Sequence, residues 1–111
     1  MLSDSNGKLL VYTSTSALRA RRLKPVSLAV EKMAKVLKAN VEVVTFRKRF
    51  IPIYVYYKDG EEEPIPIYCN NDGEPDLHDV CTALKNMMFV LSFHPRHTSL
   101  RQMRKEIMQF S

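Results

Sequence analysis

Apolar and polar positions alternate most regularly in residues 51–69, and this alternation predicts a β-hairpin. The apolar residues at every second position are Ile51, Ile53, Val55, Tyr57, Ile65, Ile67 and Cys69. Residues 58–63 between them are polar and form the predicted turn. Pro64 and Pro66 cannot donate backbone hydrogen bonds to a neighbouring strand. The second strand of the hairpin is therefore expected at the edge of a sheet.

The chain before the hairpin has the pattern of a strand, a helix and a second strand. Residues 8–13 (KLLVYT) and 41–46 (VEVVTF) are short apolar runs of the kind that form strands. Pro25 fits the first turn of a helix between them, and Asn40 fits its end. The apolar stripe of this helix is formed by Val26, Ala29, Val30, Met33 and Leu37. Two strands joined in this way are usually parallel, with a right-handed crossover.

Two further helices are predicted after the hairpin. The first begins at Pro75 and is ended by His94-Pro95. Its buried stripe is formed by Leu77, Val80, Cys81, Leu84, Met88 and Leu91. Its apolar surface is extended beyond that stripe by Met87, Phe89 and Val90. Ser99 and Gln102 have the spacing of a capping box for the second helix.

The resulting order, β-α-β-β-β-α-α, predicts a single small α/β domain, with α+β as the alternative class. We expect a four-stranded mixed sheet with two to three helices over residues 8–111, and a flexible N-terminus at residues 1–7. A chain of 111 residues is long enough to bury a core without disulfides or metals. Its hydrophobic fraction of 45% is ordinary for a globular protein.

The net charge of +5 hides a segmental pattern. Residues 1–50 carry eleven Lys/Arg and three Asp/Glu, residues 51–95 carry two and eight, and residues 96–111 carry four and one. The three segments therefore have net charges of +8, −6 and +3. Such a distribution selects charged partners if the basic residues form one patch. Alternatively, the basic and acidic segments neutralise each other within the fold.

The two cysteines, Cys69 and Cys81, fall on predicted apolar faces. We expect buried free thiols rather than a disulfide, which suits a reducing, intracellular compartment, cytoplasmic or nuclear. No apolar run approaches the roughly 20 residues that span a bilayer, so no membrane is expected as a partner. The first residues, MLSDSNGK, lack the basic and apolar pattern of a signal peptide.

Residue types that carry catalysis or bind metals occur, but not in patterns that specify a site. His94 and His97 lie three residues apart with neither cysteine adjacent in sequence, so we interpret them as exposed imidazoles rather than zinc ligands. Glu61, Glu62 and Glu63 are interpreted as the solvated tip of the hairpin. With three glycines in total, a Gly-rich phosphate loop is not expected. We therefore predict a protein that is not an enzyme, with no catalytic residues, no metal and no cofactor.

Three stretches resemble a glutaredoxin-type thioredoxin fold: KLLVYTSTSALRARR, PVSLAVEKMAKVLKANVEVVTF and YVYYKDGEEEPIPIYC. They resemble the first strand with its active-site loop, the following helix and strand, and the final hairpin. The resemblance implies a thioredoxin-like fold, but residues 13–24 hold no cysteine and therefore no redox thiolate. A helix expected between the second and third strands is also missing. A parse that starts at Pro25 resembles double-stranded-RNA-binding domains, but residues 70–76 are acidic where those domains are basic.

Two functions follow from these patterns. The first is a non-catalytic protein-interaction domain of adaptor or scaffold type, which binds another protein or itself. We assign its contacts to Tyr54, Tyr56, Met87, Phe89 and Phe93. The alternative is binding of RNA or single-stranded DNA, in which cations hold phosphates and rings stack on bases. Its cations are Arg19, Arg21, Arg22, Lys24, Arg47, Lys48 and Arg49. Against this alternative, a sheet with helices on both faces favours burial of Tyr54 and Tyr56 beneath a helix.

Overall fold

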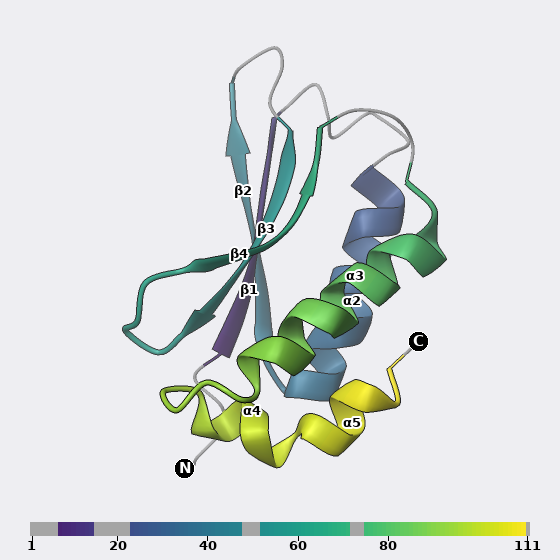
Figure 1. Cartoon of the computed structure of the whole chain (residues 1–111). Coiled ribbons are helices and arrows are strands. Elements are labelled where there is room, and N and C mark those ends of the chain that lie inside the picture. The colour runs from purple at the N-terminus through teal and green to yellow at the C-terminus, as the bar shows by residue number, and fades with distance from the viewer. Residues whose placement is uncertain (1–6, 15–22, 48–51, 72–74, 111) are drawn as a thin grey trace.

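The computed structural model describes residues 7–14, 23–47, 52–71 and 75–110, and it confirms the predicted class of fold. The chain forms a small α/β domain with a four-stranded mixed sheet (Figure 1). The strands are β1 (Gly7–Ser14), β2 (Asn40–Phe46), β3 (Ile53–Asp59) and β4 (Ile65–Asn70). The helices are α2 (Leu23–Leu37), α3 (Leu77–Leu91), α4 (Thr98–Gln102) and α5 (Arg104–Met108). Gly7, which we expected in the flexible N-terminus, is the first residue of β1.

The strands lie in the order β2-β1-β3-β4. β1 is parallel to β2, as the strand–helix–strand pattern predicted, and it is antiparallel to β3. β3 and β4 are the two antiparallel strands of the predicted hairpin. β4 lies at one edge of the sheet, as its prolines predicted, and β2 lies at the other edge.

All of the described helices lie on one side of the sheet or at its end. Figure 1 shows α2 and α3 side by side against the same face, with α4 and α5 near one end of these two helices. The core lies between this face and the helices, where alternate strand residues such as Leu9, Val11 and Val55 are buried. They pack with the apolar stripes of α2 and α3 and with Ile107 of α5. None of the described helices covers the opposite face, which we call the helix-free face.

Two helix ends differ from the sequence prediction. α2 ends at Leu37, because Lys38 adopts a left-handed conformation with φ of 55°. The backbone N–H of Ala39 then donates to the carbonyl of Ala34 at 2.9 Å, and Asn40 already belongs to β2. The predicted capping box is wrong: α4 begins at Thr98, its N-cap is His97, and that cap makes no side-chain hydrogen bond. The predicted last helix is divided at Met103 into α4 and α5.

An irregularity in the β3–β4 pairing changes which residues of β4 face the core. Val55 is paired with Tyr68 and Tyr56 with Pro66, so β4 has one extra residue at this point. Because side chains alternate between faces, the extra residue reverses the pattern beyond Ile67. Cys69 is consequently exposed, and our prediction that it is buried is wrong. Cys81 is buried as predicted, and both thiols are free.

Candidate functional site

Four aromatic side chains gather on the helix-free face. In β1, Leu9 and Val11 face the core, so Leu10 and Tyr12 lie on the opposite face. The antiparallel register places Tyr12 opposite Tyr54 of β3. The same face of the sheet therefore carries a set of rings that we call the ring cluster. Its members are Tyr12, Phe46, Tyr54 and Tyr56.

The rings of this cluster form a continuous chain across three strands. The ring centroid of Tyr12 lies 5.8 Å from that of Phe46 in β2 and 5.2 Å from that of Tyr56 in β3. Tyr56 and Tyr54 are 6.3 Å apart. These separations are those of favourable tilted ring pairs. The three tyrosines are half-buried and Phe46 is 38% exposed, so the cluster offers ring surface to a ligand.

Cations lie at both ends of the ring cluster. Lys8 of β1 is opposite Lys58 of β3 at one end of the sheet. The Lys8 Nζ lies 3.7 Å from the Glu42 Oε1, and both side chains are about half exposed, so this ion pair is weak. At the other end, the exposed Arg47 follows Phe46 directly. The helix-free face is thus bordered by basic residues, with one carboxylate among them in β2.

Most of the cations that we assigned to nucleic-acid binding lie outside the described residues. This holds for Arg19, Arg21, Arg22, Lys48 and Arg49. Lys24 is exposed in the first turn of α2 and Arg47 is exposed after β2. Ser14, the last residue of β1, is paired with Phe46, the last residue of β2. The chain segments that hold the remaining cations therefore continue from neighbouring strand ends.

The five residues that we assigned to a protein interface divide into two groups. Tyr54 and Tyr56 belong to the ring cluster, and none of the described helices covers them, unlike our interpretation that they pack beneath a helix. The other three, Met87, Phe89 and Phe93, belong to α3 and the chain directly after it.

The second group lies where α3 ends. Met87 and Phe89 are half-buried against the core, whereas Phe93 is 55% exposed. The Phe93 ring meets the Phe89 ring edge to face at 5.0 Å, and the guanidinium of Arg104 lies 3.8 Å from its centroid. Arg104 also donates to Ser92. Phe93 is therefore held in place by a cation–π contact and not by burial.

Tyr12 and Phe46 are the two members of the ring cluster that we did not assign from sequence. Strand alternation predicts that Tyr12 lies on the other face of the sheet from Val11, and this much follows from the sequence alone. Its relation to Tyr54 and Tyr56 depends on β1 lying next to β3, which periodicity does not reveal. Phe46 joins the cluster only because the parallel register brings the ends of β1 and β2 together.

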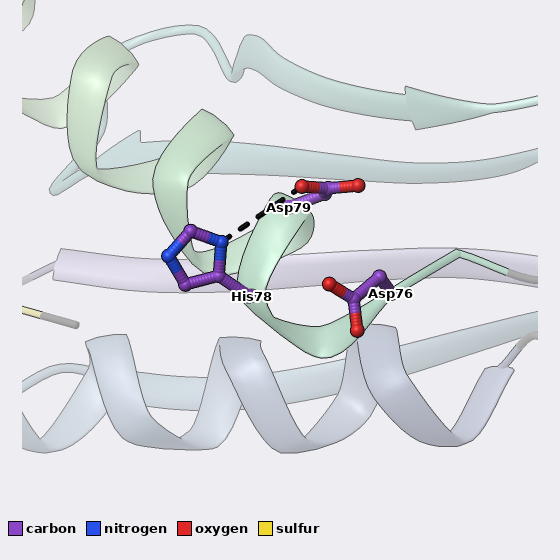
Figure 2. A group of neighbouring side chains, drawn as sticks. All are labelled: Asp76, His78 and Asp79. Carbon is purple, nitrogen blue, oxygen red and sulfur yellow. Dashed lines mark ion pairs between the residues drawn. The ribbon is translucent and has the colours of Figure 1, made fainter.

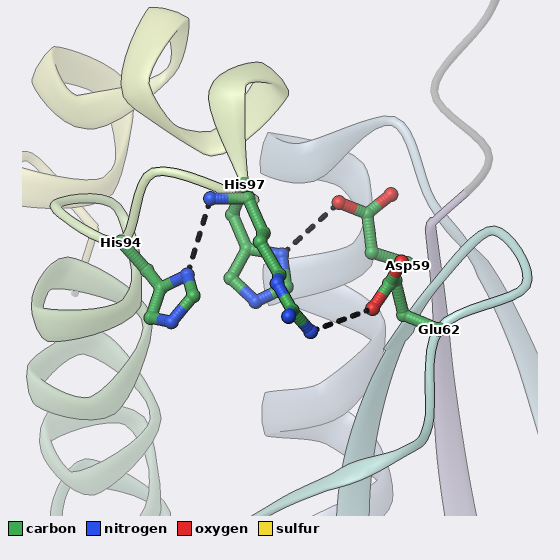
Figure 3. A network of polar contacts seen from close by, with 5 residues as sticks. Asp59, Glu62, His94 and His97 are labelled. Atoms are coloured by element: carbon green, nitrogen blue, oxygen red, sulfur yellow. Dashed lines mark hydrogen bonds and ion pairs between the residues drawn. The ribbon is translucent and has the colours of Figure 1, made fainter.

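A separate group of polar side chains joins the hairpin to the segment after α3 (Figure 3). His97 is buried, and its Nδ1 lies 3.1 Å from the Oδ2 of Asp59 at the end of β3. Our interpretation of both histidines as exposed is therefore wrong for His97 and right for His94. The backbone N–H of Arg96 donates to the Nδ1 of His94 at 3.1 Å, and the Arg96 side chain pairs with Glu62 at 3.5 Å.

A hollow of about 380 Å³ adjoins this site, lined by residues of the hairpin and of the segment after α3. Its walls include Glu62, Glu63, Arg96, His94 and His97. Acidic and basic groups face one another there, so the hollow has no dominant charge that would select a ligand. Within the described residues, His94 and His97 are not part of any group of three residues whose ligand atoms are close enough for a metal. The His97–Asp59 contact is best explained as a tie between the hairpin and the helices.

One such group of three does exist in the described part of the chain, at the N-terminus of α3 (Figure 2). Ligand atoms of Asp76, His78 and Asp79 all lie within 4.8 Å of one another. The Nδ1 of His78 is 3.9 Å from the Oδ1 of Asp79, and all three side chains are exposed. Negative charge at the first turn is favourable for the helix itself, which accounts for the two aspartates. Three exposed groups alone do not define a metal site.

Among the described residues, three titratable side chains have pKa values that burial clearly raises. Burial, together with the nearby Asp59 carboxylate, raises the pKa of Tyr57 to about 12, and a hydrogen bond with Ser99 opposes this change. Burial also raises the pKa values of Tyr68 and of the Cys81 thiol. These groups stay uncharged at neutral pH. Tyr57 and Cys81 belong to the core and not to the ring cluster.

Comparison of the chain with models of protein families, with curated proteins and with solved structures finds no match. Within the described parts of the chain, none of the helices is long and apolar enough to cross a bilayer. Function is therefore inferred from the ring cluster and its surroundings. Phenol and phenyl rings offer stacking, apolar contact and hydrogen bonds to a ligand.

Proposed function

We propose that this protein is a non-catalytic binding domain that holds single-stranded nucleic acid on the ring cluster. The observation that carries the proposal is the chain of four contacting rings on a sheet face that no described helix covers. Unpaired bases stack on aromatic side chains, and every base has a face suited to such stacking. Rings arranged across adjacent strands offer successive stacking positions. Their partial exposure leaves these positions accessible without unfolding the core.

The charges around the ring cluster favour a phosphate backbone that runs away from the hairpin turn and toward Arg47. The hairpin turn beyond Lys58 carries Glu61, Glu62 and Glu63, which are exposed and repel phosphate. The opposite end carries Arg47, and further arginines and lysines follow the ends of β1 and β2 in the sequence. We therefore expect the nucleic acid to cross the rings and to leave toward Arg47. Attraction between these cations and phosphates makes the affinity fall with salt.

Fluorescence anisotropy with labelled oligouridylate and oligothymidylate tests this proposal. Stacking of one base on one ring is worth about 1–3 kcal/mol, so Tyr54→Ala is expected to weaken binding roughly 5- to 140-fold. Tyr12→Ala is expected to have at least as large an effect, because Tyr12 contacts both Phe46 and Tyr56. Arg47→Ala is expected to reduce the slope of log K against log salt by about 0.7 if it contacts one phosphate.

Phe93→Ala is the matched control, since it removes an exposed ring that lies away from the ring cluster. Its affinity for both oligonucleotides should equal that of the unaltered protein. Circular dichroism of each variant checks that the fold is retained. The proposal fails if the unaltered protein does not bind at low salt, or if Tyr12→Ala and Tyr54→Ala bind as tightly as Phe93→Ala.

Protein interaction is the second candidate function, and a separate observation favours it. Val90 and Phe93, three residues apart at the end of α3, are 63% and 55% exposed. Residues with this spacing lie on one side of a helix and its continuation, so they form an apolar contact surface. If this surface binds a second copy, Phe93→Ser lowers the mass measured at high concentration by light scattering. An unchanged mass excludes self-association at this surface.

The resemblance to a glutaredoxin-type domain is proposed for the fold and not for the chemistry. Its support is the succession of strand, helix, parallel strand, hairpin and helix in the chain. A redox activity is not proposed, because residues 13–24 hold no cysteine.

A further inference from the structure

The two edges of the sheet differ in how they are protected from pairing with another strand. Unpaired N–H and C=O groups at an edge attract further strands, and natural proteins block them with prolines, bulges and charges. β4 has Pro66 within the strand and an irregular pairing beside it. β2, Asn40–Phe46, has neither proline nor glycine and pairs regularly with β1 over its whole length. Of the two edges, β2 is the open one.

The side chains of β2 also suit pairing with another strand. Every residue of β2 is exposed or half-buried, including Val41 at 38% and Val43 at 50%. Three of its seven residues are valine and one is threonine, which favour the extended conformation. Glu42 is its only charged residue, and the Lys8 side chain of the neighbouring strand accompanies it. The usual charge-based protection of an edge is therefore weak here.

We propose that β2 pairs antiparallel with β2 of a second copy, about a twofold axis at Val43. Val43 is the central residue of the strand, so this register pairs all seven residues. It places Val43 opposite Val43 of the second copy and Glu42 opposite Val44 of the second copy. A register centred on Glu42 would instead place two carboxylates directly opposite each other, which is unfavourable. The sequence of β2 is thus complementary to itself in the register centred on Val43.

This pairing joins two four-stranded sheets into one continuous sheet of eight strands. Residues directly opposite in an antiparallel pair point to the same face, so both ring clusters lie on the same side. Phe46 is opposite Asn40 of the second copy, and the two Phe46 residues are about 20 Å apart along the strands. A strand of nucleic acid would then meet two ring clusters on one surface. This last consequence rests on the proposed function, whereas the pairing itself does not.

Analytical ultracentrifugation without nucleic acid tests the pairing. The unaltered protein is expected to approach twice the 12.9 kDa mass of one chain as its concentration rises. Val43→Lys removes a valine pair and places like charges opposite each other, so its dimer dissociation constant is expected to rise about 2- to 25-fold. Val41→Lys is the matched control on the same strand and the same face. Its lysine would lie opposite Thr45 of the second copy, so the dimer should persist.

Mixing two charged variants of Val43 distinguishes charge repulsion at the interface from misfolding, because misfolded variants would not dimerise when mixed. Val43→Glu alone is expected to weaken the dimer as Val43→Lys does, but an equimolar mixture of the two should strengthen it again through opposite charges. The pairing is refuted if the unaltered protein has the mass of one chain at every concentration. It is also refuted if Val43→Lys and Val41→Lys weaken the dimer equally, if the mixture dimerises no more tightly than the single variants, or if the mass grows without limit. Nucleic-acid binding by a monomeric protein would refute this inference and leave the proposed function standing.

Discussion

The contact between His97 and Asp59 predicts a measurable coupling between the hairpin and the segment after α3. The His97 side chain is 4% exposed, the Asp59 side chain is 19% exposed, and their contact atoms are 3.1 Å apart. Asp59→Ala leaves the buried Nδ1 of His97 without this partner. Leaving a buried polar atom unsatisfied costs about 1–3 kcal/mol, and we expect a loss of unfolding free energy in that range.

His97→Ala is expected to be more destabilising than Asp59→Ala. It also removes a buried ring that packs edge to face against Tyr57 with centroids 5.9 Å apart. The double variant should lose less stability than the sum of the two single losses, by about 0.5–3 kcal/mol, because the contact can be lost only once. Urea unfolding followed by circular dichroism gives each free energy, with an unchanged m-value as evidence that the unfolded state is comparable.

Glu62→Ala is the control for this cycle. Glu62 pairs with Arg96 on the surface, where both side chains are more than half exposed, so its loss should cost about 0–1 kcal/mol. If the effects of Asp59→Ala and His97→Ala add to within about 0.3–0.5 kcal/mol, the two residues are independent and the explanation of this contact is wrong.

Two further predictions concern buried titratable groups. The pKa of Tyr57 is raised from 10.0 to about 12, so between these values the unfolded chain releases the proton first and stability falls as pH rises. Urea unfolding should show a loss of about 1.4 kcal/mol from this residue between pH 9 and pH 11, and Tyr57→Phe should lack that part of the loss. A thiol-specific disulfide reagent at neutral pH should modify the exposed Cys69 rapidly and Cys81 slowly, because Cys81 is buried and its pKa is raised. Equal rates at the two thiols in the folded protein would contradict the exposure of Cys69.

The secondary structure of the described chain was largely predictable because its local patterns agree with the fold. The alternation that begins at Ile53 and the helical stripe that begins at Val26 both correspond to buried faces of the structure. Pro66 within β4 and Pro64 just before it correctly indicated an edge strand. These features depend on residues close together in sequence, where spacing alone determines which side chains share a face.

The features that were missed depend on contacts between distant segments. The exposure of Cys69 results from one extra residue in β4, which pairing with β3 reveals and alternation does not. His97 is buried because Asp59, 38 residues earlier, provides a partner for its ring. Tyr54 and Tyr56 were expected beneath a helix because helices commonly cover both faces of a mixed sheet. The ring cluster depends on the strand order, which places Tyr12 between Phe46 and Tyr56.

The most direct test of the proposed function is to locate the bound nucleic acid on the protein. Ultraviolet cross-linking of a single-stranded oligonucleotide, followed by peptide mass spectrometry, identifies the residues that lie against its bases. We predict adducts on the ring cluster, at Tyr12, Phe46, Tyr54 or Tyr56, and their loss when Tyr12 is replaced by alanine. Adducts confined to α3, α4 and α5, or no adducts under conditions where binding is measured, would contradict the proposal that the helix-free face of the sheet is the binding surface.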